Sequence, residues 1–234
     1  MKRLLICLLL FCTNCFAEPI EFVVSSLAGG PDDTVTRKVV DLLEANTNLR
    51  FVVMYIPGAA HRIGYNYIMR SEKPTVTIST TEILENDVIG YVETIYTLGE
   101  FNNAIAVNAK SKFFTIQDLS NKAIVNFGHG GEGTFSQKAM QQLCASMNCL
   151  PVPFKGGSEG MLNILNNTID AFAIANYGTL YSNNDKFRIV GYTRVKNSWL
   201  KIFGKNLSKQ DTKTIRDILK NTNTKFYTDM GLTQ

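Results

Sequence analysis

Residues 22–37 read Phe-Val-Val-Ser-Ser-Leu-Ala-Gly-Gly-Pro-Asp-Asp-Thr-Val-Thr-Arg. An apolar run, typical of a buried β-strand, ends at Gly29-Gly30-Pro31, and apolar residues then recur at the spacing of an amphipathic helix. A glycine turn that leads into a helix leaves backbone N–H groups unpaired at the positive end of the helix dipole. The stretch therefore predicts a strand, a turn and a helix whose start can bind an anion.

The same arrangement occurs twice more. Residues 123–125 lead into Gly-His-Gly-Gly-Glu-Gly at 128–133, and residues 151–154 lead into Gly156-Gly157-Ser158. We expect the turns at Gly29, Gly131 and Gly156 to face one cleft, where they would hold a small anion.

The first seventeen residues have the pattern of an export signal. Lys2 and Arg3 precede an apolar run at 4–11, and Ala17 ends the segment before Glu18-Pro19. This pattern predicts a signal peptide at 1–17 that is cleaved after Ala17, so that the protein is periplasmic. A retained membrane anchor is the alternative, but the run is about half of the roughly 20 residues that a spanning helix needs. Lipid attachment at Cys12 or Cys15 is disfavoured because Thr13-Asn14 is polar.

The composition is that of an ordinary globular protein, and the net charge gives no sign of nucleic-acid binding. The chain has 234 residues, of which 45% are hydrophobic and 19% charged. Removal of the signal peptide lowers the formal net charge from +4 to about +2, which is too little to indicate nucleic acid as a partner.

Only Cys144 and Cys149 of the five cysteines lie beyond the signal peptide. In an exported chain such a pair indicates a disulfide, with two free thiols as the alternative. The two histidines, His61 and His129, lie in no metal-ligand spacing with these cysteines. We therefore predict neither a metal nor a cofactor.

Strand and helix patterns alternate along the rest of the chain. Strands are expected at 20–25, 51–56, 76–79, 104–107, 122–126, 150–154, 171–175 and 189–193. Helices are expected at 33–45, 63–70, 82–88, 115–119, 134–144, 159–165 and 209–220, with Thr115 and Ser208 as N-caps. This order predicts an α/β fold with parallel sheets covered by helices on both faces. The short strands favour two lobes joined by a hinge, with lobe 1 at 18–107 plus about 197–234 and lobe 2 at 108–196.

Four motifs resemble those of one protein family, the solute receptors of tripartite tricarboxylate transporters, also called Bug proteins. Residues 28–37 are similar to its Gly-Gly-Pro turn followed by Asp and, four residues later, Arg. Residues 57–64 resemble its Pro-Gly-Ala-Gly-Gly-x-Ile-Gly turn, residues 127–134 its Gly-x-Gly-Ser turn, and residues 152–157 its Val-Pro-Tyr-Lys-Gly. Two family segments are missing, Pro-Asp-Gly-Tyr-Thr after Met69 and a Pro-rich stretch where residues 194–198 stand.

The resemblance implies a type II periplasmic binding protein fold, in which two α/β lobes close over a small organic carboxylate. It implies a monomeric receptor without catalytic activity, and a membrane transporter subunit as partner. An exported sensor or interaction protein without such a partner is the alternative, which the missing segments motivate. The implied ligand-binding residues are Leu27, Ala28, Gly29, Asp33, Ala59, His129, Gly131, Gly133, Thr134, Gly156, Gly157, Ser158 and Asn176.

Several of these residues have two interpretations. Asp33 lies four residues before Arg37, so it either forms a surface ion pair or contacts the ligand. His61 replaces a family glycine and either narrows the pocket or lies exposed in a loop, and His129 could assist anion binding through its charge near pH 6. Asn176 stands where many family members carry an acid, so Asn176 or Tyr177 is the expected polar contact. The lack of an acid at this position argues against an ammonium-bearing ligand.

Two glycine turns also match enzyme motifs. Gly128-x-Gly130-x-x-Gly133 has dinucleotide-binding spacing, but the next strand ends at Phe154-Lys155 without an acid for the ribose. Gly156-x-Ser158-x-Gly160 has the spacing of a hydrolase nucleophile elbow, but no histidine follows His129. We expect no enzyme, and a serine hydrolase that uses Ser158 is the less favoured alternative.

Overall fold

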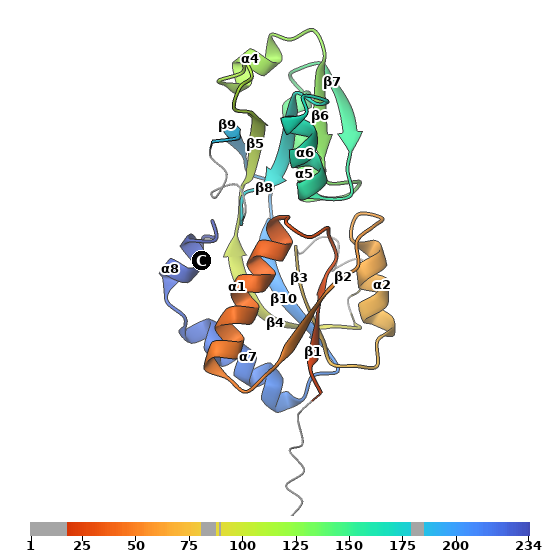
Figure 1. Cartoon of the computed structure of the whole chain (residues 1–234), viewed down its shortest axis with the longest axis vertical. Helices are drawn as coiled ribbons and strands as arrows, with labels where there is room; N and C mark the ends of the chain where they lie inside the picture. Colours follow the sequence, from red (N-terminus) through yellow and green to blue (C-terminus); the bar gives the residue numbers. More distant parts are fainter. Residues whose placement is uncertain (1–17, 81–87, 89, 179–184) are drawn as a thin grey trace, which may run out of the picture.

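The computed structural model describes residues 18–80, 88, 90–178 and 185–234, and Figure 1 shows two α/β lobes stacked along its long axis. The predicted signal peptide lies outside the described residues, as does the predicted helix at 82–88 except for its last residue. Each lobe contains one five-stranded sheet. The predicted two-lobed α/β class is therefore confirmed.

Lobe 1 is built around a sheet with the strand order β2-β1-β3-β10-β4. Its strands are β1 (Ile20–Val24), β2 (Phe51–Tyr55), β3 (Thr75–Thr80), β4 (Glu93–Glu100) and β10 (Trp199–Lys205). Its helices are α1 (Pro31–Asn46), α2 (Arg62–Arg70), α7 (Lys209–Asn221) and α8 (Thr224–Thr228). In Figure 1, α1 and α2 lie on either side of the β1–β2 region, and α7 crosses below the sheet.

Lobe 2 is built around a sheet with the strand order β7-β6-β8-β5-β9. Its strands are β5 (Asn103–Asn108), β6 (Val125–His129), β7 (Cys149–Pro153), β8 (Ala171–Ala175) and β9 (Phe187–Thr193). Its helices are α4 (Ile116–Ser120), α5 (Phe135–Cys144) and α6 (Gly157–Leu165). Strand β1 pairs in parallel with both of its neighbours, β2 and β3, and strand β6 does the same with β7 and β8.

The sheets are mixed, so the expectation of parallel sheets was wrong in part. β10 runs antiparallel to β3 and β4, and β5 runs antiparallel to β8 and β9. Strands β4 and β10 were not predicted because both are only partly buried and carry interspersed Thr, Lys, Glu or Gly residues rather than a continuous apolar run. Their pairing also contains register shifts, which break the two-residue alternation that sequence patterns detect.

The boundary between the lobes also differs from the prediction. The strand at 103–108 was assigned to lobe 1, within residues 18–107, but it pairs with β8 and β9 in the sheet of lobe 2. All six residues of β5 are buried, so its apolar run does not tell which sheet it joins. The chain therefore crosses between the lobes at residues 101–102 and returns at 194–198.

Aromatic residues connect the two lobes at the first crossing. The ring of Phe101 meets Phe135 of α5 edge-on, with centroids 5.6 Å apart, and meets Tyr177 in the same way at 4.9 Å. All three residues are buried and belong to a core cluster that includes Val35 of lobe 1 and Phe127 of lobe 2. The hinge is therefore packed rather than open.

Local caps start several helices where the sequence predicts them. Thr115 accepts a hydrogen bond from Asp118 N and forms a capping box with it, and Ser208 accepts one from Asp211 N. The cap satisfies N–H groups that the first helical turn leaves unpaired.

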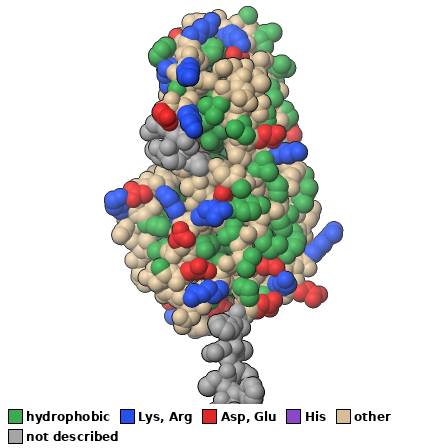
Figure 2. Space-filling model, in the orientation of Figure 1, with side chains coloured by type: hydrophobic (Ala, Val, Ile, Leu, Met, Phe, Trp, Pro, Cys, Tyr) green, Lys and Arg blue, Asp and Glu red, His purple; other side chains and the backbone are tan. Residues whose placement is uncertain are grey.

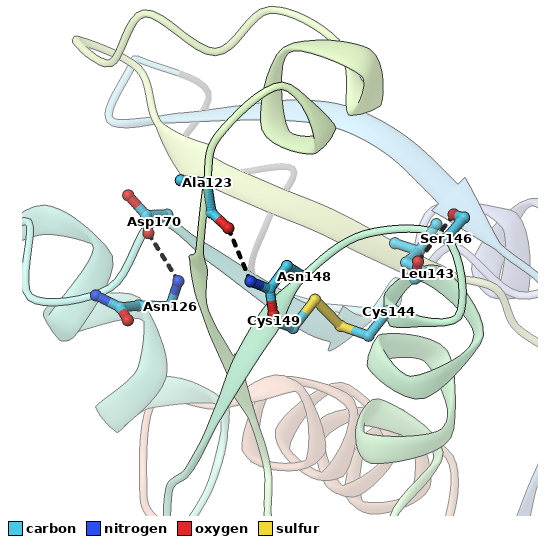
Figure 3. The surroundings of a disulfide bond; sticks show 8 residues. All are labelled: Ala123, Asn126, Leu143, Cys144, Ser146, Asn148, Cys149 and Asp170. Carbon is cyan, nitrogen blue, oxygen red and sulfur yellow. Dashed lines mark hydrogen bonds between the residues drawn. A yellow bond between two sulfur atoms is a disulfide. The ribbon is translucent and has the colours of Figure 1, made fainter.

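A disulfide joins Cys144, at the end of α5, to Cys149, at the start of β7 (Figure 3). The Cα atoms are 5.7 Å apart. Asn148, in the connecting loop, donates through Nδ2 to Ala123 O, and Ser146 donates through Oγ to Leu143 O. These contacts fix the loop that connects α5 to β7.

Charges of both signs are interspersed over the face of the molecule that Figure 2 shows. Within the part of the chain that the structure describes, no helix is long and apolar enough to cross a membrane. The same residues contain no group of three or more His, Cys, Asp or Glu side chains that could hold a metal ion.

Candidate functional site

Three helix N-termini meet at one cavity between the lobes. The cavity is lined by Pro31 and Asp32 at the start of α1, by residues 134–136 at the start of α5, and by Gly156 and Gly157 at the start of α6. Its volume is about 70 Å³. The other lining residues are Ser26, His61, Thr80, Phe101, Gly130, Phe172, Ala173, Ile174, Ala175 and Tyr177.

Glycines let the lobes approach each other closely around this cavity. A Cβ atom on Gly157 would lie 2.9 Å from Pro31 Cδ, and one on Gly131 would lie 3.1 Å from Ala60 Cβ. At Gly156, a Cβ atom would lie 3.7 Å from Leu27 N, which is ordinary contact. The two lobes therefore touch through their turns, next to the cavity that both of them line.

Two of the three helices start without a side-chain cap. The N-caps of α1 and α6 are Gly30 and Gly156, and neither provides a side-chain hydrogen bond to its helix. At α5, by contrast, Thr134 accepts a hydrogen bond from Gln137 N. Uncapped first-turn N–H groups carry the positive end of the helix dipole and bind anions without a charged side chain.

A buried hydroxyl at the cavity also has no partner. Ser26 is 3% exposed, lines the cavity, and its Oγ has no hydrogen-bond partner among the described residues. A buried hydroxyl without a partner costs free energy, so a polar group bound in the cavity would gain a hydrogen bond there.

The wall from lobe 1 carries a carboxylate and an imidazole. Asp32 Oδ1 accepts a hydrogen bond of 2.8 Å from the Tyr177 hydroxyl, and Asp32 Oδ2 lies 3.9 Å from His61 Nδ1. Burial, followed by the charge of Asp32, raises the pKa of Tyr177 well above its ordinary value. Tyr177 therefore stays protonated and donates to Asp32.

Asp33 points away from the cavity. It is buried and accepts hydrogen bonds from Gly29 N at 2.7 Å, from Arg37 Nε at 2.8 Å and from the Tyr55 hydroxyl at 2.7 Å. Of the two interpretations of Asp33, the structure favours the ion pair with Arg37. The carboxylate also takes up the N–H of Gly29, which was expected to face the ligand.

His129 is also separate from the cavity, which corrects the expected role of its charge. It ends β6, is 1% exposed, and its Nδ1 lies 3.2 Å from Gly131 O and 3.3 Å from Gly131 N. Burial lowers the pKa of His129, because it disfavours the charged form of the ring. It supports the turn at Gly131 rather than attracting an anion.

The ligand-binding residues predicted from the sequence divide into those that line the cavity and those that do not. Thr134, Gly156 and Gly157 line the cavity. Leu27 and Gly131 lie where the lobes touch, and a Cβ atom on Gly30 would lie 3.8 Å from Ser158 N. The cavity lining does not include Leu27, Ala28, Gly29, Asp33, Ala59, His129, Gly131, Gly133, Ser158 or Asn176.

Sequence reasoning missed Ser26 and Asp32, and it left His61 out of the expected site. All three lie within or beside the motifs that it used, because Ser26 precedes the first glycine turn, Asp32 follows it, and His61 ends the second motif's turn. The sequence offered two signals for these residues: Ser26 and Asp32 lie next to the glycine turn of the first motif, and His61 replaces a glycine of the family pattern.

The hydrolase alternative finds no support in this arrangement. Ser158 lines a separate groove, together with Met161, Leu162 and Phe187. The only histidine in the same lobe, His129, is buried against Gly131. A serine nucleophile needs a base within hydrogen-bond reach, and no hydrogen bond joins Ser158 to a histidine in the described part of the chain.

Comparison with solved structures identifies the fold. The chain resembles the periplasmic binding protein BugD with 18% identity and a TM-score of 0.76, over 91% of this chain and 86% of that one. It resembles MatC (Rpa3494) from Rhodopseudomonas palustris with bound malate, with 12% identity and a TM-score of 0.74, over 91% of this chain and 88% of that one. It also resembles R. palustris Rpa4515 with adipate, with 14% identity and a TM-score of 0.73, over 86% of this chain and 81% of that one. No protein-family profile and no curated protein matches the sequence. The chain therefore has the periplasmic binding protein fold.

Proposed function

We propose that this protein is a periplasmic solute-binding protein that captures a small organic carboxylate between its lobes and catalyses no reaction. The observation that carries the proposal is the convergence of the α1, α5 and α6 N-termini on one interlobe cavity. The cavity also holds the hydroxyl of Ser26, which has no hydrogen-bond partner among the described residues.

The chemistry of the cavity suits a carboxylate. No Lys or Arg is among the described residues that line it, so these residues offer an anion mainly backbone N–H groups and hydroxyls. Hydrogen bonds from such donors to a carboxylate are charge-assisted and stronger than neutral ones. A second lobe that closes over the ligand completes its desolvation.

Two lines of evidence support the more specific role of receptor for a tripartite tricarboxylate-type transporter. The four motifs resemble those of the Bug receptors, and the fold is shared with BugD. MatC and Rpa4515, which share the fold, are described with malate and adipate, which are both carboxylates. We infer that the chain is exported by residues 1–17 and delivers its ligand, as a monomer, to a membrane transporter subunit.

An exported sensor without a transporter partner is the second candidate. The segments at 72–77 and 194–198 favour it, because both differ from the family pattern. The second of these forms the return crossing between the lobes. Altered surfaces there would leave ligand binding intact while removing a docking site.

Thermal unfolding with a panel of di- and tricarboxylates, amino acids and aromatic acids tests the binding function. A ligand at 100 times its Kd stabilises the protein by about 2.7 kcal/mol, so at least one acid is expected to raise Tm clearly. In Gly157→Val, the added side chain would clash with Pro31 and Ile174, since a Cβ atom at this position lies 2.9 Å from a carbon atom of each. We expect this variant to lose the ligand-induced rise in Tm. If no acid raises Tm, the binding function is wrong.

A further inference from the structure

Among the described residues that line the cavity between the lobes, Asp32 carries a carboxylate and none is Lys or Arg. The Asp32 side chain is 18% exposed. A ligand that carried only carboxylates would therefore bind next to a partly buried charge of its own sign, and this repulsion is weakly screened.

Among the described residues, one oxygen of Asp32 is available to a ligand. Oδ1 accepts the hydrogen bond from Tyr177, whereas Oδ2 has no hydrogen-bond partner in the described part of the chain and lies 3.9 Å from His61 Nδ1. That separation is too long for a hydrogen bond. An ionised carboxylate accepts up to about four hydrogen bonds, so Oδ2 can accept one from a group in the cavity.

The surroundings of Asp32 keep this oxygen in place. Tyr177 is buried and packs edge-on against Phe101, and His61 stacks on the buried Tyr65 with centroids 6.1 Å apart. Asp32 itself lies in the first turn of α1, where the helix dipole stabilises an acid. The carboxylate is therefore held in a fixed orientation at the cavity.

We propose that the solute is an amino carboxylate, whose ammonium group donates to Asp32 Oδ2 while its carboxylate is bound at the helix N-termini. This inference rests on the proposed binding function and narrows its ligand class. The ammonium replaces the repulsion from Asp32 with a charge-assisted hydrogen bond.

The inference reverses the expectation drawn from Asn176. The sequence has no acid at that position, which lies in lobe 2, and this absence argued against an ammonium-bearing ligand. The structure places Asp32 at the cavity from lobe 1, next to Tyr177. An acid from the opposite wall can bind the same group.

Calorimetric titration of the protein with matched pairs of acids tests this inference. The pairs L-aspartate and succinate, L-glutamate and glutarate, and L-alanine and propionate each differ by one amino group. We expect the amino member of at least one pair to bind about tenfold tighter, or more, than its partner. Asp32→Asn is expected to weaken that amino acid about tenfold and to leave the plain acid unchanged or tighter.

Two controls separate the charge of Asp32 from other effects. Asp217→Asn makes the same change on α7, where Asp217 is half-exposed and paired with Lys213 at 2.9 Å, and we expect no change in affinity. Asn at position 32 still offers an oxygen to Tyr177, and thermal unfolding of the unliganded variant checks that the fold is kept.

The outcomes distinguish the two proposals. Equal affinity within every pair, or an amino-acid preference that survives Asp32→Asn, overturns the inference and leaves carboxylate binding standing. If neither member of any pair binds, and the wider acid panel gives no thermal shift, carboxylate binding itself is wrong.

Discussion

The two walls of the interlobe cavity use different chemistry. Lobe 2 lines it with glycines, apolar residues and the starts of α5 and α6, whereas lobe 1 contributes the start of α1 together with Ser26, Asp32 and His61. Both walls offer helix N-termini to an anion, and the wall of lobe 1 adds the negative charge of Asp32. We propose that both lobes bind the carboxylate and that lobe 1 provides the choice among carboxylates.

The lobes also fix their turns in different ways. In lobe 1, the Asp33 carboxylate binds the turn at Gly29 and connects it to Arg37 and Tyr55. In lobe 2, the Thr134 hydroxyl donates to Gly131 O at 2.8 Å and caps α5, whose far end is joined to β7 by the disulfide. Substitutions in each lobe can test whether these supports differ in strength.

The largest effect on stability is expected from Asp33→Asn. The change removes a buried charge that accepts three hydrogen bonds and should lower the free energy of unfolding by about 3 kcal/mol. Urea denaturation measures this, and Asp41→Asn, on an exposed position of α1, is the matched control. A loss no greater than that of the control would show that Asp33 does not hold the turn.

A smaller effect is expected from the double variant Cys144→Ser/Cys149→Ser. The bridge closes a short loop, with a sequence separation of 5, so its removal should lower the free energy of unfolding by about 2 kcal/mol. Because the bridge lies at the end of α5 opposite Thr134, ligand affinity in calorimetry should not change. An unchanged stability, or a lost affinity, would contradict this division of roles.

The smallest effect, of opposite sign, is expected from Ala60→Gly. Ala59, Ala60 and His61 are three consecutive non-glycine residues with positive φ, at 47°, 49° and 74°. The left-handed conformation costs an L-residue about 1–2 kcal/mol, so glycine at position 60 should raise the free energy of unfolding by about 1 kcal/mol. Ala28→Gly, in the first turn, where φ is not positive, should give no gain, and equal effects of both changes would contradict the assignment of strain.

The sequence predicted much of the fold because glycine turns and caps are local signals. The strand, turn and helix around Gly29 and the caps at Thr115 and Ser208 depend on neighbouring residues alone. The lobe to which β5 belongs could not be predicted, since any apolar strand can pair with either sheet. Nor could antiparallel β10, which returns from the far end of the chain.

The site was harder to predict than the fold. Asp32 and Asp33 are adjacent in the sequence, but one step along a helix turns a side chain by about 100°, so one acid lines the cavity while the other binds Arg37. His129 follows a strand in the motif, yet packing buries it. Which side chain faces a cavity depends on packing between the lobes, and the motifs do not contain that information.

An NMR titration of the backbone amides with L-aspartate follows the proposed N–H donors individually. The proposed binding mode predicts saturable shifts that are largest at Asp32, Phe135, Ser136 and Gly157, which line the cavity in the first turns of the three helices. Saturable shifts confined to other surfaces, such as the groove around the disulfide, would show that the helix N-termini do not hold the ligand.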